Sequence, residues 1–267
     1  MNSLQSCTIS ILPGISRDGK PEEFERIDIY SGDTVSIVGS TGSGKSAFIN
    51  DIEVLAQSDT ITRRTILING APPSEEMVRN PALKPIVLIT QNNRCIADLR
   101  VSDFLSLHMK ARGIDDASVL LETIDLANEF TGEKIHPGYR MTALSGGQTR
   151  SLFIADAIRI GDAPILLLDE VENAGIAKER VINRIKEHGR SVILVTHDPL
   201  LALSTDRRIV MHNGAVREII HPSGSEHTLV RQLTEMDRFI THIREQVRSG
   251  ERFTDTLVTI PEIAVAT

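Results

Sequence analysis

The sequence lacks the features that would place it in a membrane, outside the cell or on nucleic acid. No apolar run approaches the ~20 residues that a membrane-spanning helix needs, and the first residues carry no secretory signal pattern. The two cysteines, Cys7 and Cys95, form no CxxC pair, which argues against a disulfide framework or a zinc site. The formal net charge is −7 and no dense Lys/Arg run occurs. We therefore expect a cytoplasmic protein with no nucleic-acid partner.

The length and the order of apolar segments indicate an α/β protein. The 267 residues are enough for one large domain with a subdomain. Alternating polar and apolar residues predict short strands before residue 31, and a closing hairpin split by Asn213-Gly214 is predicted at 208–219. Between them, apolar runs alternate with helix-like segments, which is typical of a parallel sheet covered on both faces. The apolar runs lie at 34–38, 85–90, 165–168 and 191–196.

The first apolar run leads into a glycine-rich segment, and a helix-like run follows. The residues of this segment are Gly39, Ser40, Thr41, Gly42, Ser43, Gly44, Lys45 and Ser46. They fit G-x-x-x-x-G-K-S/T, and the flanking strand and helix are the context that identifies a P-loop. Glycines let successive backbone N–H groups point at one phosphate, and the helix N-terminus adds positive potential. Lys45 is expected to reach the β- and γ-phosphates, and the Ser46 hydroxyl to ligate Mg²⁺.

Two carboxylates follow the apolar run 165–168. Asp169 and Glu170 come at the C-terminal end of this predicted strand, where ligands gather in parallel sheets. Asp169 is expected to hold magnesium through water, and Glu170 to polarise an attacking water. Because a P-loop needs a metal-binding acid, this pair about 120 residues downstream of it predicts nucleotide hydrolysis.

A short segment before another predicted helix carries a serine and two glycines. It consists of Leu144, Ser145, Gly146, Gly147 and Gln148. A serine hydroxyl and glycine N–H groups at a helix N-terminus form an anion site. Beside a P-loop, this segment resembles the LSGGQ signature of the ATP-binding cassette (ABC) ATPases. In that family the signature reaches across a head-to-tail dimer to the γ-phosphate held by the partner's P-loop.

The resemblance covers about residues 8–220 and implies a fold, ligands and further site residues. The implied fold is a P-loop NTPase with a RecA-like parallel sheet core, an antiparallel β subdomain and a helical subdomain inserted at about 95–143. Gln91 resembles the Q-loop glutamine, which contacts magnesium and senses the γ-phosphate, and His197 resembles the H-loop histidine. The implied ligands are ATP and Mg²⁺, and the implied partner is a second cassette in a homodimer. With Glu170, these two residues form the implied catalytic set.

The chain departs from the family pattern at several positions. Ile176 replaces the aspartate of the D-loop, and Asp156 stands where an arginine is common after the signature. The family stacks an aromatic residue on adenine, but no aromatic occurs at 15–20. Arg17 could stack by a cation–π contact, or Phe24 could take that place. A preference for ATP over GTP therefore rests on the resemblance alone.

We expect residues 1–220 to form the cassette, and the tail at 221–267 lies outside the resemblance. Its apolar residues recur at spacings of 4, 3, 4, 3 and 4, which predicts a heptad-patterned helix at about 228–249. Packing of this helix on its own cassette and pairing with a second chain are the two interpretations. The apolar positions are Leu229, Leu233, Met236, Ile240, Ile243 and Val247.

Two kinds of work are open for the ATP. The leading hypothesis is the ATP-binding subunit of a transporter, peripheral on the inner face of the membrane, with the segment 91–107 receiving a permease helix. The rival is a non-transport ABC ATPase that acts on a soluble protein complex, as in metalloenzyme activation or assembly. Ile176, the altered segment after the signature and the heptad tail favour the rival. A stable partner with several membrane spans would decide for the first.

Overall fold

The computed structural model describes residues 7–90, 93, 95–170 and 178–252. Its strands are β1 (Ile9–Leu12), β2 (Ile27–Ile29), β3 (Thr34–Val38), β4 (Thr65–Ile68), β5 (Ile86–Ile89), β6 (Ile165–Asp169), β7 (Ser191–Val195), β8 (Arg207–His212) and β9 (Ala215–Ile220). Its helices are α1 (Lys45–Val54), α2 (Glu75–Arg79), α3 (Val101–Ala111), α4 (Ser118–Phe130), the 3-10 helix η1 (Met141–Ala143), α5 (Gly146–Arg159), α6 (Lys178–Glu187), α7 (Pro199–Leu203) and α8 (Gly224–Ser249).

The larger sheet has six strands in the order β5-β6-β7-β3-β8-β9. All neighbours are parallel except β8 and β9, which form the predicted hairpin. Asn213 and Gly214 turn this hairpin with φ angles of 50° and 81°, the left-handed conformation that an Asn-Gly pair adopts readily. β7 lies between β3 and β6, so the strands that lead to the P-loop and to Asp169 are separated by a single strand.

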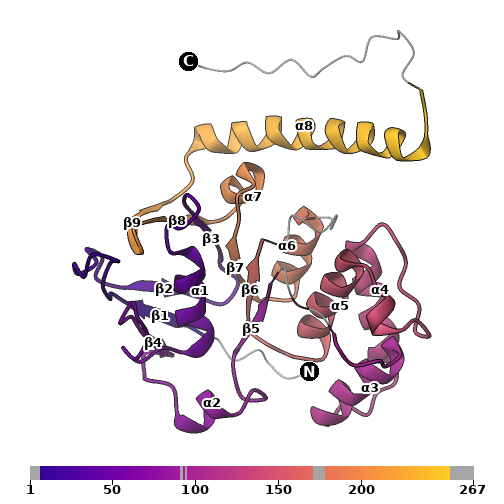
Figure 1. Cartoon of the computed structure of the whole chain (residues 1–267), viewed down its shortest axis with the longest axis horizontal. Helices are drawn as coiled ribbons and strands as arrows, with labels where there is room; N and C mark the ends of the chain where they lie inside the picture. Colours follow the sequence, from indigo (N-terminus) through magenta and orange to yellow (C-terminus); the bar gives the residue numbers. More distant parts are fainter. Residues whose placement is uncertain (1–6, 91–92, 94, 171–177, 253–267) are drawn as a thin grey trace.

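The parallel strands are buried because both faces of the larger sheet are covered. Side chains along β6 alternate between two cores, with Leu166 and Leu168 in one and Ile165 and Leu167 in the other. The first core includes residues of α3, α4 and α5, and the second includes α1 and the smaller sheet. Figure 1 shows these layers on opposite sides of the strands. The predicted covered parallel sheet is confirmed.

The smaller sheet and the helical layer correspond to the two predicted subdomains. The smaller sheet is antiparallel, with β1 between β2 and β4. The helical layer contains α3, α4 and η1, inserted between β5 and α5. Val101, Leu105 and Met109 recur on one face of α3 and are buried there, which is the pattern of a helix packed on one side. The expected fold class, an α/β cassette with both additions, is confirmed.

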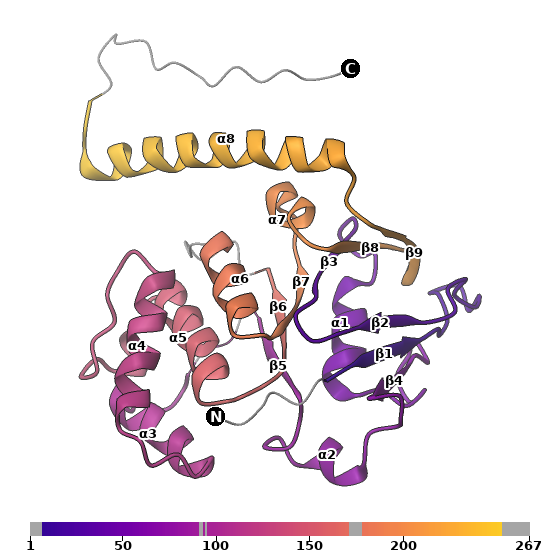
Figure 2. The same ribbon diagram turned by 180° about the vertical axis from the view of Figure 1, so that it is seen from behind.

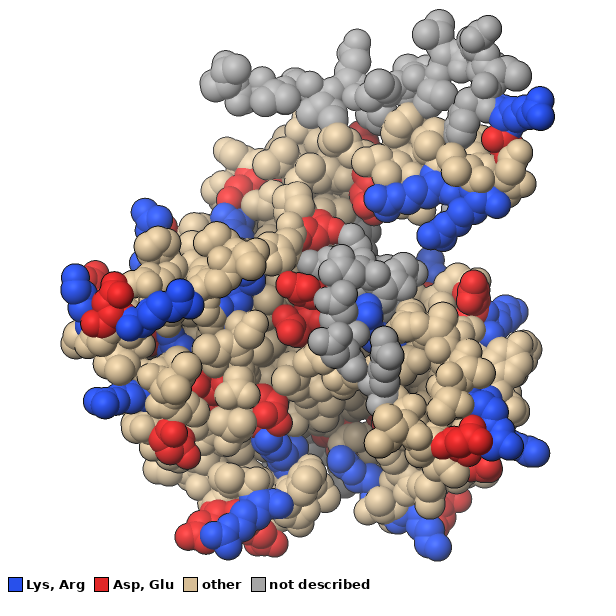
Figure 3. Space-filling view, in the orientation of Figure 1, with Lys and Arg blue, Asp and Glu red and all other residues tan. Residues whose placement is uncertain are grey.

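The C-terminal helix α8 begins earlier than the heptad pattern predicts. Ser223 accepts a hydrogen bond from the Glu226 backbone N–H, and the Glu226 carboxylate accepts one from Ser223 N–H, so a capping box starts the helix at Gly224. Figures 1 and 2 show α8 lying across one end of the cassette beyond α7. Open space lies beneath its C-terminal half in Figure 3. Among the described side chains of α8 none is buried. No helix in the described residues is both long and apolar enough to span a bilayer.

Candidate nucleotide-binding site

The P-loop joins β3 to α1 at the carboxyl edge of the larger sheet. Gly39 and Gly44 have φ angles of 152° and 104°, which side-chain-bearing residues rarely adopt. A Cβ on Gly39 would lie 2.5 Å from the Met211 carbonyl oxygen, and one on Gly44 would lie 2.7 Å from the Gly214 Cα. Glycine is therefore required at both positions. The close approach also seats the P-loop against the turn between β8 and β9.

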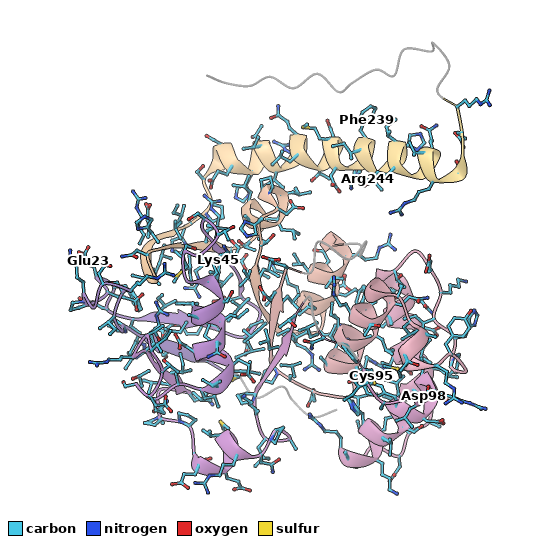
Figure 4. The ribbon with its side chains drawn as sticks, in the orientation of Figure 1. Glu23, Lys45, Cys95, Asp98, Phe239 and Arg244 are labelled. Carbon is cyan, nitrogen blue, oxygen red and sulfur yellow. The ribbon has the colours of Figure 1, made fainter. Side chains whose placement is uncertain are left out.

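Lys45 is the first residue of α1, and its side chain lies inside the curve of the P-loop. Only 7% of the residue is exposed. Its Nζ donates hydrogen bonds to the carbonyl oxygens of Gly39 at 2.8 Å and Ser40 at 3.1 Å. Figure 4 shows Lys45 at the N-terminal end of α1. A positive charge is thus held where the loop and the helix N-terminus meet.

The P-loop offers donors that a chain of phosphates would satisfy. The first N–H groups of any α-helix lack partners within the helix, and the N-cap Gly44 supplies no side-chain acceptor for those of α1. Among the described residues, the buried Ser43 Oγ has no hydrogen-bond partner. Ser46 is exposed in the first turn of α1. These groups fit a triphosphate, and a serine hydroxyl beside it fits Mg²⁺, which is commonly held by few protein ligands together with phosphate oxygens.

Two carboxylates and an imidazole meet at the same edge of the sheet. Asp169 ends β6 in register with Val195 of β7. The Glu170 N–H donates to the Val195 carbonyl oxygen at 3.0 Å. The His197 Nε2 lies 3.6 Å from the Glu170 Oε1, with these side chains 48% and 34% exposed. Since β7 lies between β3 and β6, these groups share the edge with the P-loop.

Local structure fixes the backbone around this pair. Glu170 has a φ of 49°, a conformation that costs about 1–3 kcal/mol for a non-glycine residue and concentrates at functional sites. After β7, the Asp198 carboxylate caps α7 by accepting a hydrogen bond from the Leu200 N–H at 2.9 Å. Pro199 occupies the first turn of α7. The sequence reasoning missed α7, although an Asp-Pro pair is a helix-start signal.

The signature segment forms the N-terminus of α5. Ser145 Oγ accepts the Gln148 backbone N–H at 3.2 Å, and Gln148 Oε1 accepts the Ser145 N–H at 2.9 Å. Ser145 and Gly146 are exposed, whereas Gln148 is buried. The Gln148 amide also donates to the carbonyl oxygens of Glu133 and Lys134, so its side chain supports the segment from inside. α5 and α1 cover opposite faces of the sheet, which separates the exposed end of the signature from its own P-loop.

A buried arginine, which the sequence reasoning missed, braces the turn against the P-loop. Arg64 Nη2 donates to the Gly214 carbonyl oxygen at 2.7 Å, and the Gly214 N–H donates to the Ser43 carbonyl oxygen at 2.8 Å. Arg64 also forms ion pairs with Glu22 at 2.7 Å and with Asp51 at 2.9 Å. These three side chains are 0–2% exposed. No local sequence pattern marks the network, because its members come from distant segments.

Two predicted residues lie outside the described part of the chain. Gln91, the expected Q-loop glutamine, follows β5, and Ile176 lies between β6 and α6. Their roles stay predictions. Phe24, the second alternative for base stacking, is partly buried against the core that contains α1.

Comparisons with known sequences place the chain among ABC proteins. The chain matches the ABC transporter family over residues 26–173. The uncharacterized ABC transporter ATP-binding protein MJ0121 of Methanocaldococcus jannaschii is 46% identical over 246 residues, which cover 92% of this chain and 94% of that protein. The macrolide export ATP-binding/permease protein MacB of Escherichia coli is 25% identical over 255 residues, and the chain spans 38% of its length.

Solved structures show the same fold. CbiO1 of Clostridium perfringens, described as part of the ABC transporter complex CbiONQ, superposes with a TM-score of 0.63 at 22% identity and covers 90% of this chain and all of that one. The ATP-binding cassette MJ0796, in a dimeric post-hydrolysis state bound to ADP and Pi, gives a TM-score of 0.60 at 23% identity. That match covers 81% of this chain and 99% of the other.

Proposed function

The chain belongs to the ABC transporter family as an ATP-binding protein, and from this premise we propose that it hydrolyses Mg-ATP to drive a membrane partner. The observation that carries the proposal is the carboxyl edge of β3, β7 and β6. A P-loop lysine, a strand-end aspartate and a glutamate–histidine pair meet there. This combination suits phosphoryl transfer to water, in which positioning and charge stabilisation supply most of the catalysis.

Each residue of this edge has a role in the proposal. The P-loop N–H groups cradle the phosphates, and the Lys45 ammonium contacts the β- and γ-phosphates. Ser46 and Asp169 would hold Mg²⁺, with Gln91 as a further ligand. When bound, the ion would offset negative charge on the phosphates. Glu170 orients and polarises the attacking water. His197, whose Nε2 lies 3.6 Å from the Glu170 Oε1, contacts the γ-phosphate.

The other half of each site comes from a second chain. Ser145, Gly146 and Gly147 bind the γ-phosphate of the partner cassette, and Gln148 holds them in place from inside. This proposal is supported by the exposed signature at the start of α5 and by its distance from the chain's own P-loop across the sheet. ATP then joins two cassettes, and hydrolysis removes the bridging phosphate so that the dimer opens.

For the work done by this cycle we propose transport, at the inner face of a membrane. Residues 1–220 act as the cassette and 221–267 as an extension, and a permease helix binds at 91–107. The names of MJ0121, MacB and CbiO1 support this choice, because each refers to an ABC transporter or exporter. The heptad-patterned α8, with no described side chain buried, favours a second candidate, action on a soluble protein complex.

Copurification from native cells distinguishes the two. Tagged Glu170→Gln protein is captured with Mg-ATP present, and tagged Lys45→Ala protein serves as a matched control that cannot enter the ATP-bound state. We expect a protein with several membrane spans to accompany the first variant and to be depleted in the second. A soluble complex, recovered from the cytosol without any membrane protein, would contradict the transport proposal and support the second candidate.

A further inference from the structure

A nucleotide on this P-loop has a reactive end and a nucleoside end. In the proposed site, the reactive end faces the edge where Asp169, Glu170 and His197 gather. The nucleoside must therefore leave the loop elsewhere, past its exposed residues. Ser40, Thr41 and Gly42 are exposed. The elements that touch this exposed part from outside the loop decide what the base meets.

The exposed side chain of Arg17 reaches the P-loop from outside the loop. Arg17 Nη2 donates to the Gly42 carbonyl oxygen at 2.9 Å. The Arg17 backbone N–H donates to the Asn213 carbonyl oxygen at 2.9 Å, so this residue also joins the turn that seats the loop. Arg17 is exposed, and a bond from one nitrogen leaves the flat faces of its guanidinium available.

The segment that carries Arg17 is held in shape by its own backbone hydrogen bonds. Ser16 N–H donates to the Lys20 carbonyl oxygen at 2.8 Å, and Gly19 N–H donates to the Ser16 carbonyl oxygen at 3.0 Å. Gly19 has a φ of 74°, which permits this tight turn. A bridge between Ile15 and Pro21 closes its base. The backbone that carries the guanidinium is thus positioned by contacts within the protein, which lowers the entropy cost of contact with a base.

The segment that carries Arg17 has no aromatic side chain that could stack on a base. Residues 13–22 contain no Phe, Tyr, Trp or His, and the Phe24 ring packs against the core. Within this segment, the planar side chain beside the P-loop is therefore Arg17. A guanidinium plane stacks on nucleobases and on other π systems.

We propose that Arg17 stacks on the purine base of the bound nucleotide while its Nη2 keeps the bond to Gly42. The inference rests on the proposed nucleoside triphosphate site and adds its base specificity. Stacking uses the face of the base and tolerates changes at its edge, because every base has a π face. Adenine and guanine should consequently bind with similar affinity, and the smaller pyrimidines more weakly.

Equilibrium titration by calorimetry tests this with Mg²⁺ and three ligands: ATP, GTP and inorganic tripolyphosphate. Arg17→Ala should weaken ATP and GTP by about tenfold, or about 1.4 kcal/mol, and leave tripolyphosphate unchanged. Arg17→Tyr should restore nucleotide affinity, whereas Arg17→Lys, which keeps the charge without the plane, should not. Lys20→Ala is the matched control, because it removes an exposed positive charge from the same turn.

The outcomes separate this inference from the proposed function. Equal weakening of ATP and tripolyphosphate in Arg17→Ala, or rescue by Arg17→Lys, would show that Arg17 acts on phosphate or on loop shape, and would overturn base stacking. Unchanged ATP affinity in Arg17→Ala would do the same. A Lys45→Ala protein that binds ATP as well as the wild type would instead overturn the P-loop assignment on which the inference depends.

Discussion

Replacing Arg64 by methionine should destabilise the protein strongly, because it removes the cation from a buried network. In the native protein the guanidinium donates to both Glu22 oxygens, at 2.7 and 2.8 Å, and to Asp51 Oδ2 at 2.9 Å. It also stacks on the Phe48 ring, 4.9 Å from its centroid, and donates to the Gly214 carbonyl oxygen. Methionine keeps much of the volume and none of these donors.

The expected magnitude follows from what stays behind. Glu22 and Asp51 are 0% and 2% exposed, so their carboxylates would remain buried without a countercharge. Removing one partner of a buried ion pair costs about 3–5 kcal/mol. Glu22 keeps the N–H groups of Gly14 and Val216, and Asp51 keeps the Thr62 hydroxyl, which places the loss toward the lower end of that range. This is a large part of the ~5–15 kcal/mol typical of a folded domain.

Urea unfolding followed by circular dichroism measures the loss as a shift in free energy of unfolding. Arg63→Ala is the control, since its side chain is exposed next to Arg64 and its removal should change stability by less than about 0.5 kcal/mol. The double variant Glu22→Gln/Arg64→Met removes a buried charge together with its partner and should recover part of the loss. If Arg64→Met lowers the free energy of unfolding by less than about 1 kcal/mol, the view that this network holds the antiparallel β subdomain, α1 and the β8–β9 turn together is refuted.

Three further perturbations test separate parts of the site and fold. Lys45→Ala should abolish the rise in melting temperature that Mg-ATP gives the wild type, and an ATP-dependent rise in the variant would contradict the P-loop assignment. Gly44→Ala should lower the free energy of unfolding by about 1–3 kcal/mol and weaken nucleotide binding, because residue 44 has a φ of 104° and the added Cβ would collide with Gly214. A urea unfolding curve equal to that of the wild type would show that the β8–β9 turn shifts without cost. A hydrogen bond to Asp156 raises the pKa of His108. Partial burial and the positive charge of Arg112 act in the opposite direction and are outweighed. Because the folded pKa is raised, the pair stabilises fully below the unfolded value of about 6.5 and loses this contribution as pH rises through the folded pKa. The effect is small because the His108 side chain is half-exposed. His108→Gln should lower the free energy of unfolding more at pH 6 than at pH 9. Equal losses at both pH values would argue against a stabilising His108–Asp156 pair.

Much of the core and half of the candidate site could be predicted because their signals are local. The P-loop, the carboxylates after β6 and the serine before α5 each combine a short motif with a strand or helix boundary, and the structure places Lys45, Asp169 and Glu170 along one edge. The alternation of β6 between two cores likewise follows from apolar runs in sequence.

Other features depend on contacts between distant segments and gave no such signal. Arg64 meets Glu22 from 42 residues away and Gly214 from 150 residues away, and neither partner looks unusual in sequence. Asn213-Gly214 was recognisable as a hairpin turn, but its position under the P-loop depends on β8 lying beside β3. The early start of α8 was marked by Ser223 and Glu226, whose capping box lies before the heptad pattern.

The central claim is that ATP joins two chains through a site in which Glu170 promotes hydrolysis. The molar mass of Glu170→Gln protein, measured by light scattering during gel filtration with and without Mg-ATP, tests it most directly. The account predicts a shift with ATP from about the chain mass of 29.4 kDa, or from any ATP-independent assembly, to twice that mass, and no shift when Ser145→Arg is added. An unchanged mass under conditions where the protein binds ATP would contradict the account.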